Sequence, residues 1–447
     1  MAITTTPGAA VGTAPAPGPS RRVGPGRLVG AAGLVVLVGA LVALGASAAA
    51  GGASLVPAGR AGLPPWLAGP LRGIGPAGGY EALMLAVCAG YCLVLAWAPA
   101  LGKGMLWSGI VLAHVAALAG PPLFSADVFG YLDFARLGVL HGLDPYTHTA
   151  AAAAHDAIYP YLGWHDVATP YGPLFTLFTY GLVPLGVAGG IWALKVVAAG
   201  ASLATTVLVW RSAARRGHSP ERAAALIGLN PLVLAFGVAG AHNDTLLGLI
   251  VAGGLVLCLD GREARGAAAV VAGVGVKLSA GLALPFALLG ARGSGRARWA
   301  LGAAAGALVG VALIAVVGFG PDAGAIAGTV RGQQQTVAVH SLPSLVSRTL
   351  GDGRLGGGVR AAFTGFGALA VAAALGYAWR RPGRWLEAYG WATLGVLVST
   401  AWLLPWYALW ALLPAALSDD SRLRAATLAL CAYLVATRLP LAYPLLG

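Results

Sequence analysis

Long apolar runs, separated by short polar segments, occupy most of the chain from residue 28 onward. A membrane-spanning helix needs about 20 apolar residues, and most of the runs approach that length. They lack the alternation of polar and apolar positions that a transmembrane barrel would show. The pattern predicts an all-α polytopic integral membrane protein with roughly 11 to 14 transmembrane helices. The runs lie at about 28–50, 80–99, 105–123, 173–188, 191–210, 223–240, 245–259, 266–276 with 278–290, 299–319, 359–379, 386–403, 405–418 and 425–445.

Basic residues gather in the short segments between the runs, as they do in the cytoplasmic loops of membrane proteins. Counting crossings from a cytoplasmic N-terminus places the polar segments 124–172 and 320–358 outside. We therefore expect a multi-pass plasma membrane protein with its active site facing outside, a disordered cytoplasmic N-terminus over 1–27 and a transmembrane domain over 28–447. The basic clusters are Arg21–Arg27, Lys103, Arg211–Arg222, Arg262–Arg265, Arg292–Arg298, Arg380–Arg384 and Arg422–Arg424.

Two regions do not fit this count of crossings. The stretch 173–210 is long enough for two spans, although an odd number is needed to return Arg211 to the cytoplasmic side. The stretch 266–291 lies between two basic clusters but is too short for two complete spans. Short, kinked or re-entrant helices packed against protein would resolve both conflicts.

The composition supports the membrane assignment and narrows the partners. Hydrophobic residues make up 58% of the chain and charged residues 10%, whereas soluble domains carry about 25% charged residues. The net charge of +13 comes from basic residues clustered between spans, so it indicates membrane topology and not nucleic-acid binding. Membrane lipids are the expected surroundings.

The segment 124–172 concentrates the chain's ionisable groups. It contains five of the fifteen acidic residues and four of the eight histidines, and such groups mark function in membrane proteins. Asp127 lies just past the end of an apolar run, so we expect it at the membrane–water boundary. Residues 128–139 have apolar positions at helical spacing, which predicts an amphipathic helix along the membrane surface.

The four histidines of this segment suggest a metal site at first sight. His141, His148, His155 and His165 are separated by seven, seven and ten residues, which is unlike any compact zinc motif. Pro145 also breaks any helix that they could share. We therefore expect no metal and no cofactor, with a divalent ion held by Asp and His side chains as the open alternative.

Several short motifs, in a fixed order, resemble those of a known enzyme class. The set resembles the GT-C-fold glycosyltransferases, and within them the actinobacterial polyprenol-phosphomannose-dependent mannosyltransferases, including glycosyltransferase family 87 and the α-1,6-mannosyltransferases of lipoglycan assembly. The resemblance covers roughly residues 105–420. The motifs are Asp127-Val128-Phe129-Gly130-Tyr131, Gly142-Leu143-Asp144-Pro145-Tyr146, Tyr171-Gly172-Pro173, His242-Asn243-Asp244, Val276-Lys277-Leu278 and Leu404-Pro405-Trp406-Tyr407.

The resemblance implies a GT-C-type helical bundle and an inverting transfer of mannose, or a related sugar, from a polyprenyl-phosphate-linked donor. The acceptor would be a glycan or glycolipid of the cell envelope. A carboxylate must take the proton of the acceptor hydroxyl, and by resemblance that residue is Asp127. The alternative role of Asp127 is an N-cap of the helix that follows, because Asp is a preferred cap residue.

The donor phosphate requires positive charge on the outer side, where the chain has little. Lys277 lies in an apolar run, where a charged amine is costly unless it meets an anion or a cavity. It is a candidate phosphate ligand, with an internal ion pair or a side chain extended to the interface as alternatives. Arg331 and Arg348, in the segment 320–358, are the other candidates, since Arg binds phosphate with two hydrogen bonds.

The expected sugar and acceptor contacts come from both outer segments and from the His-Asn-Asp motif. His242 and Asp244 have a plainer alternative, in which Asp244 caps the helix 245–259. The residues 333–335 and His340 have the alternative of a solvated loop. The full set is Tyr131, Asp144, Tyr146, Tyr171, His242, Asp244, Gln334 and His340.

A polyprenol-linked glycan flippase or transporter is the main alternative function, and a non-catalytic scaffold is a second. A flippase would need ionisable groups along a path through the bilayer centre, whereas the sequence indicates only Lys277 at depth. A scaffold would not need a lone acid beside a groove that opens to lipid.

Overall fold

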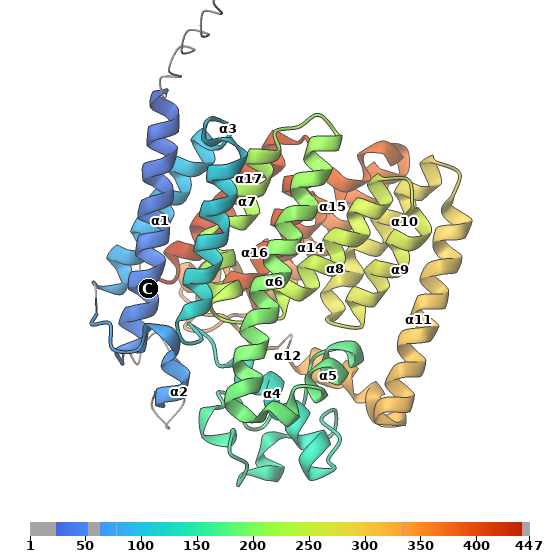
Figure 1. Ribbon diagram of the computed structural model, residues 1–447. Helices are drawn as coiled ribbons and strands as arrows, with labels where there is room; N and C mark the ends of the chain where they lie inside the picture. Colours follow the sequence, from blue (N-terminus) through green and yellow to red (C-terminus); the bar gives the residue numbers. More distant parts are fainter. Residues whose placement is uncertain (1–23, 52–62, 77, 334, 440–447) are drawn as a thin grey trace, which may run out of the picture.

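The computed structural model describes residues 24–51, 63–76, 78–333 and 335–439. Within these ranges the chain forms helices and turns and contains no strand, so the protein is an all-α membrane protein (Figure 1). Most of the predicted tail 1–27, Gln334 and the end of the expected span 425–445 lie outside the described residues. Five segments there are long and apolar enough to cross a membrane, and a bent pair makes up to six: Pro25–Ala49, Tyr80–Ala119, Pro173–Arg215, Ala297–Phe319, Gly357–Arg380 and the pair Pro220–Gly228 with Leu232–Val238.

Helix α3 (Tyr80–Ala119) reverses direction at Gly102, whose φ of 72° is in the region that favours glycine. Gly102 divides α3 into a first arm before it and a second arm after it. On α1 (Pro25–Ala49), Gly33 packs against Gly90 of the first arm, whereas Gly45 packs against Gly120, which follows the second arm. The first arm therefore runs antiparallel to α1 and the second parallel to it. These arms are the two expected spans 80–99 and 105–123, and the glycines let the three backbones approach closely.

The conflict at 173–210 is resolved by a short helix. Helix α5 (Pro173–Tyr180) has only eight residues, which is about 12 Å at 1.5 Å per residue. Helix α6 (Gly186–Arg215) has 30 residues and extends across the molecule (Figure 1). One crossing therefore replaces the two that the apolar pattern suggested.

Three helical hairpins extend only part of the way through the molecule (Figure 1). The first joins α7 (Pro220–Gly228) and the π-helix η6 (Leu232–Val238) to α8 (Asp244–Leu259). The second joins α9 (Glu263–Val274) to η7 (Leu278–Leu282) and α10 (Ala283–Gly293). The third joins α15 (Trp385–Ser399) through η10 (Pro405–Tyr407) to α16 (Ala408–Leu417). We call residues 239–243, 275–277 and 400–407 the hairpin turns.

The opposite ends of these hairpins meet at an arginine-rich end of the molecule. There Arg215 pairs with Asp260 at 2.9 Å and Arg296 pairs with Glu263 at 3.1 Å. Arg216 donates to the Leu417 carbonyl at 2.8 Å, which brings the end of α16 to the same place. The hairpin 263–293 therefore begins and ends on one side, as the short apolar stretch between two basic clusters predicts.

The 124–172 loop and the segment 320–356 lie at the other end. The loop begins with α4 (Asp127–His141), whose apolar face is buried at Val128, Leu132 and Ala135. The helix packs against α5 and α6, so the expectation that this face lies in the lipid boundary is wrong for these residues, whereas Val139 at the end of the helix is 46% exposed. The segment 320–356 contains α12 (Ile326–Gln333) and α13 (Leu342–Thr349).

Two long helices remain largely outside the packed bundle. In α11 (Ala297–Phe319) and α14 (Gly357–Arg380), only 11% of the residues in the apolar 18-residue stretch of each helix are buried. Side chains such as Val317 and Leu369 are exposed by 84% and 71%. An exposed apolar surface of this size is expected to contact lipid. The remaining helix of the bundle, α17 (Ser421–Ala436), packs beside α15 and α16.

Candidate active site

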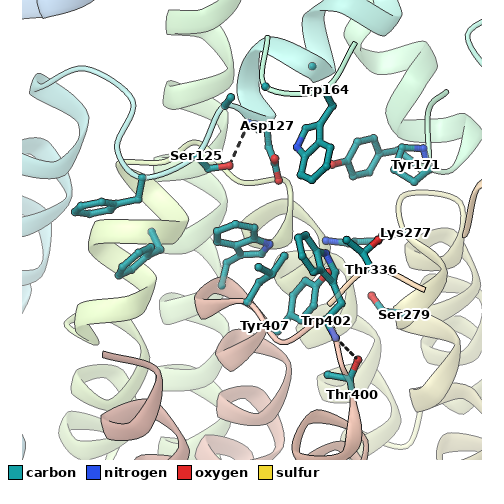
Figure 2. Close-up of a pocket in the computed structure, with 18 of the residues that line it drawn as sticks. Ser125, Asp127, Trp164, Tyr171, Lys277, Ser279, Thr336, Thr400, Trp402 and Tyr407 are labelled. Carbon is teal, nitrogen blue, oxygen red and sulfur yellow. Dashed lines mark hydrogen bonds between the residues drawn. The ribbon is translucent and has the colours of Figure 1, made fainter. Parts of the chain in front are cut away.

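A cavity of about 950 Å³ lies where the 124–172 loop meets the turns 275–277 and 400–407 (Figure 2). Ten aromatic side chains contribute to its wall, and its charged residues are Glu81, Asp127, Lys277 and Arg438. The aromatic residues of the wall are Tyr80, Phe124, Phe134, Trp164, Tyr171, Phe236, Trp402, Trp406, Tyr407 and Trp410.

Asp127 begins α4 and contributes its carboxylate to the cavity. The N-cap position of the helix belongs to Ala126, and no side chain caps the helix, so the cap alternative for Asp127 is not realised. Its Oδ2 lies 3.5 Å from His242 Nδ1, and its backbone N–H donates to Ser125 Oγ at 3.1 Å. Burial raises the pKa of the carboxyl to about 6, and Lys277 opposes this increase. A carboxyl with this pKa is ionised at neutral pH yet basic enough to accept a proton.

Lys277 lies at the turn of the second hairpin and forms an ion pair at the base of the cavity. Its Nζ is 2.8 Å from Asp244 Oδ2, and it lies over the rings of Tyr407 and Trp410 at 5.1 and 5.6 Å. Trp410 Nε1 donates to the other oxygen of Asp244 at 2.8 Å. The internal ion pair is thus the arrangement present. Asp244 begins α8 without capping it through a side-chain bond.

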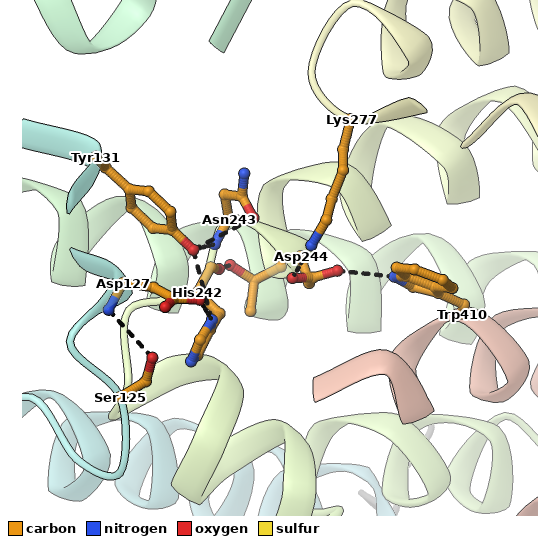
Figure 3. Close-up of polar contacts among 9 residues, drawn as sticks. Ser125, Asp127, Tyr131, His242, Asn243, Asp244, Lys277 and Trp410 are labelled. Carbon is orange, nitrogen blue, oxygen red and sulfur yellow. Dashed lines mark hydrogen bonds and ion pairs between the residues drawn. The ribbon is translucent and has the colours of Figure 1, made fainter. Parts of the chain in front are cut away.

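Behind Asp127, the side chains of His242, Tyr131 and Asn243 form a layer of polar groups (Figure 3). The His242 ring stacks on Trp406, with centroids 3.6 Å apart, and its Nδ1 lies 3.4 Å from the Tyr131 hydroxyl. Tyr131 also donates to Asn243 Oδ1 at 3.4 Å. His242 Nε2 and Asn243 Nδ2 are buried and have no hydrogen-bond partner among the described residues. These contacts hold α4 against the turn 239–243.

The end of the 124–172 loop is bonded directly to the turn that carries Lys277. Gly172 N–H donates to the Val276 carbonyl at 2.9 Å, and Leu174 N–H donates to the Gly275 carbonyl at 2.9 Å. A Cβ on Gly172 would overlap the Gly275 carbonyl, so only glycine permits this approach. The Tyr-Gly-Pro motif is therefore bonded through its backbone to the turn that contains the Val-Lys-Leu motif.

The predicted site residues divide into four groups. Tyr171 and His340, with Asp127 and Lys277, line the cavity, while Tyr131, His242 and Asp244 support it from behind. Arg331 and Arg348 lie on α12 and α13 outside its lining, and Gln334 is outside the described residues. Asp144 and Tyr146 are also outside the lining. Asp144 accepts from the Tyr146 N–H at 2.9 Å, and the Tyr146 hydroxyl donates to the Tyr171 carbonyl at 3.0 Å, so both stabilise the loop itself.

Sequence reasoning missed two cations. Arg438 lines the cavity from beyond α17, in a region expected to be part of a span. Lys195 is fully buried in α6, so the expectation that Lys277 is the only deep ionisable group is wrong. Lys195 Nζ donates to three backbone carbonyls, at 2.9 Å to Ala239 and 3.4 Å to Ala117 and Pro121. These carbonyls lie just before the segments that carry Asp127 and His242.

The histidines of the 124–172 loop take part in local contacts. Asp156 accepts from Arg136 Nε at 2.8 Å and lies 2.7 Å from His141 Nε2. The His141 and His155 rings meet edge to face with centroids 5.3 Å apart. Among the described residues, no three His, Cys, Asp or Glu side chains are grouped so that they could hold a metal ion.

Comparison with known proteins assigns the family. Residues 27–292 match the family described as alpha-(1->6)-mannopyranosyltransferase, N-terminal domain. The chain belongs to this family. The match includes α4, the first two hairpin turns and both partners of the Lys277–Asp244 pair. The turn 400–407 lies beyond it. No solved structure matches the chain.

Curated relatives carry the same name. The chain is 34% identical over 179 residues to alpha-(1->6)-mannopyranosyltransferase A of Mycobacterium tuberculosis, covering 38% of this chain and 33% of the relative. It is 28% identical over 200 residues to alpha-(1->6)-mannopyranosyltransferase A of Corynebacterium glutamicum, covering 42% and 39%. A probable alpha-(1->6)-mannopyranosyltransferase of Mycolicibacterium smegmatis is 35% identical over 158 residues, covering 33% and 27%. The chain thus spans between about a quarter and two fifths of the length of these relatives.

Proposed function

We propose that the protein is an inverting mannosyltransferase that uses a polyprenyl-phosphate-linked donor and extends a glycan or glycolipid of the cell envelope, with Asp127 as the general base. The family and the names of its relatives support mannosyl transfer. One observation carries the assignment of the base: the Asp127 carboxylate lines the cavity without capping its helix, and Lys277 lines the same cavity.

The reaction requires one proton transfer and one substitution at the sugar. The acceptor hydroxyl oxygen attacks the anomeric carbon on the face opposite the phosphate, and the bond between that carbon and the phosphate oxygen breaks. The phosphate leaves with the bonding electrons, while the hydroxyl proton passes to Asp127 Oδ. Phosphate is a good leaving group, so a single carboxylate supplies the acid–base chemistry that is needed. The configuration at the anomeric carbon is inverted.

The donor phosphate belongs near Lys277 in this proposal. The Lys277 side chain is 16% exposed and lines the cavity from the turn 275–277. Leu278, its neighbour on the cavity wall, is 56% exposed and provides an apolar rim for a prenyl chain. A phosphate oxygen can share the amine with Asp244, because an ammonium group has three donors.

We also propose that the 124–172 end faces outside and the arginine-rich end faces the cytoplasm, in the plasma membrane. This orientation follows the distribution of basic residues. It places the cavity where a lipid-borne sugar and an extracytoplasmic glycan can meet.

Transfer from radiolabelled mannosyl phosphopolyprenol, catalysed by membranes that contain the protein, tests the proposal. We expect Asp127→Asn to lower the rate of transfer by about 10³-fold or more. Asp133→Asn, in the same helix but outside the cavity, should retain the rate. Full transfer by Asp127→Asn made at the normal level would disprove the assigned base. Transfer from a soluble nucleotide sugar alone would disprove the lipid donor.

The flippase alternative gains no support from the buried ionisable groups. Lys195 is bound by backbone carbonyls. His114, which is also buried, lies within hydrogen-bond distance of the Ile110 carbonyl and Ser202 Oγ at 2.8 and 2.9 Å. Both groups are therefore satisfied by protein and do not face a path across the membrane. Movement of the lipid-linked sugar across vesicle membranes without transfer would favour the alternative.

A further inference from the structure

Two tryptophans from distant parts of the chain meet at the cavity wall. Trp164 belongs to the 124–172 loop and Trp402 to the turn 400–407, and both line the cavity. Their ring centroids are 6.2 Å apart and their planes form an angle of 77°. Two flat apolar rings at nearly a right angle form a corner open to the cavity.

Trp164 lies beside the proposed base. Gly163 packs directly on Ala126, so close that a Cβ on Gly163 would lie 3.2 Å from the Ala126 side chain. Trp164 and Asp127 are the next residues of these two touching segments. Figure 2 shows both side chains entering the cavity from the loop side, facing Trp402 and Tyr407.

The exposure of Trp164 is unusual for so large an aromatic side chain inside a folded loop. It is 53% exposed, while its main-chain surroundings are fixed by the His165 carbonyl, which accepts from the Ala151 N–H at 3.1 Å. Trp402 is held similarly, since its N–H donates to Thr400 Oγ1 at 3.3 Å and the Ala401 carbonyl accepts from the Ala338 N–H at 2.8 Å. Trp402 is partly buried. Rigid indoles that line a cavity suit binding, because little conformational entropy is lost when they are covered.

We propose that Trp164 and Trp402 form the binding platform for the terminal mannose of the acceptor. The apolar C–H face of a pyranose would pack on the Trp164 indole, and its rim would contact Trp402, which leaves its hydroxyls directed toward Asp127. The acceptor, and not the donor, is the occupant because Trp164 lies on the loop that we place at the aqueous side. The donor sugar arrives on a lipid beside the Lys277 turn. This inference rests on the proposed function.

The platform predicts a selective effect on the acceptor. In the transfer assay with α-(1→6)-linked mannotriose as acceptor, Trp164→Ala and Trp402→Ala should each raise the acceptor KM about tenfold. The donor KM should stay unchanged. Trp164→Tyr keeps an aromatic face and should retain most of the affinity. Trp299→Ala is the matched control, because Trp299 is 64% exposed on α11 away from the cavity.

A binding measurement separates this inference from the proposed function. Saturation-transfer NMR of α-(1→6)-mannotriose with Asp127→Asn protein should give a signal that Trp164→Ala removes. Normal transfer by Trp164→Ala with an unchanged acceptor KM would overturn the platform and leave the function intact. Tryptophan-dependent binding, together with no mannose transfer by the unmodified protein, would support the platform and overturn the function. If Trp164→Ala fails to fold, an unchanged acceptor KM in Trp402→Ala and Trp164→Leu would overturn the platform.

Discussion

Lys277 Nζ lies 2.8 Å from Asp244 Oδ2, and the two charges of this pair act in opposite directions on a third group. Lys277 lowers the pKa of Asp127, while Asp244 raises it. The pair is therefore more than a way to bury a lysine. It adjusts how readily the proposed base holds a proton.

This arrangement predicts the pH dependence of transfer. Because Asp127 must be ionised to accept a proton, the rate should rise with pH around a midpoint near its pKa of about 6. Removing the cation in Lys277→Met should move the midpoint to higher pH, and Asp244→Asn should move it to lower pH. Initial rates measured across the pH range give all three midpoints. Identical midpoints in the three proteins would contradict the coupling.

A double-mutant cycle distinguishes two roles of Lys277, binding of the donor phosphate and neutralisation of Asp244. Lys277→Met should lower kcat/KM for the donor by about 100-fold, the order of one charge-assisted contact. The double variant Lys277→Met/Asp244→Asn removes the unpaired acid but should remain as impaired, since the donor phosphate still lacks its cation. Recovery of donor kcat/KM in the double variant would show that Lys277 serves only to neutralise Asp244.

Lys195 is expected to determine stability as well as the position of the site. Lys195→Met leaves the Ala239, Ala117 and Pro121 carbonyls without this donor, which should lower the thermal midpoint by roughly 5 °C or more. Transfer should fall with no change in the pH midpoint, because Asp127 keeps its own neighbours. Lys103→Met, at an exposed position beside Gly102, is the control and should change neither quantity. Unfolding curves recorded in detergent, together with the pH profile, test this.

Two aspartates of the 124–172 loop should affect stability with opposite signs. Burial, with Asp156 nearby, raises the pKa of Asp133 to about 7, so the folded state is penalised as pH rises from the unfolded value of 3.8 through about 7. Asp133→Asn should therefore raise the thermal midpoint at pH 8 and have little effect near pH 4.

Asp156 is the opposite case. Burial raises its pKa, but Arg136, the Ile158 N–H and His141 outweigh burial and lower the pKa to about 2. Its stabilisation is complete above the unfolded pKa and is lost only as pH falls through about 2. Asp156→Asn should lower the thermal midpoint at both pH 4 and pH 8. A shift in the same direction for both variants at pH 8 would contradict this assignment.

The helices themselves were predictable, because apolar runs and basic clusters record where a chain meets lipid and where it turns. Every expected run forms a helix within the described residues. Where each helix ends was not predictable, since α5 has the composition of a span and only eight residues, and packing decides how far each helix extends. Asp127 could be selected because it is an isolated acid just after a span. Lys277 could be selected because a charged amine in an apolar run is energetically unfavourable without an anionic partner.

The rest of the site depends on contacts between distant segments. Nothing local to Lys195 distinguishes it from a lysine at the end of a span, because its three carbonyl partners come from α3, the following turn and the turn 239–243. Trp164 and Trp402 are separated by more than half the chain, and tryptophans are also common at membrane interfaces. The supporting role of Tyr146 likewise follows from its contact with Tyr171, which the motif alone could not reveal.

The three hairpin turns follow the 124–172 loop in the sequence, and this order has a consequence for biosynthesis. At about 5–20 residues per second, a ribosome needs roughly 10 to 50 s to proceed from residue 172 to residue 407. During that interval the nascent loop must keep its shape without the turns that later complete the cavity. The contacts of Asp156 with Arg136 and His141, and of Tyr146 with Tyr171, lie entirely within the loop. They equip it to fold early and to serve as the surface on which each later hairpin docks.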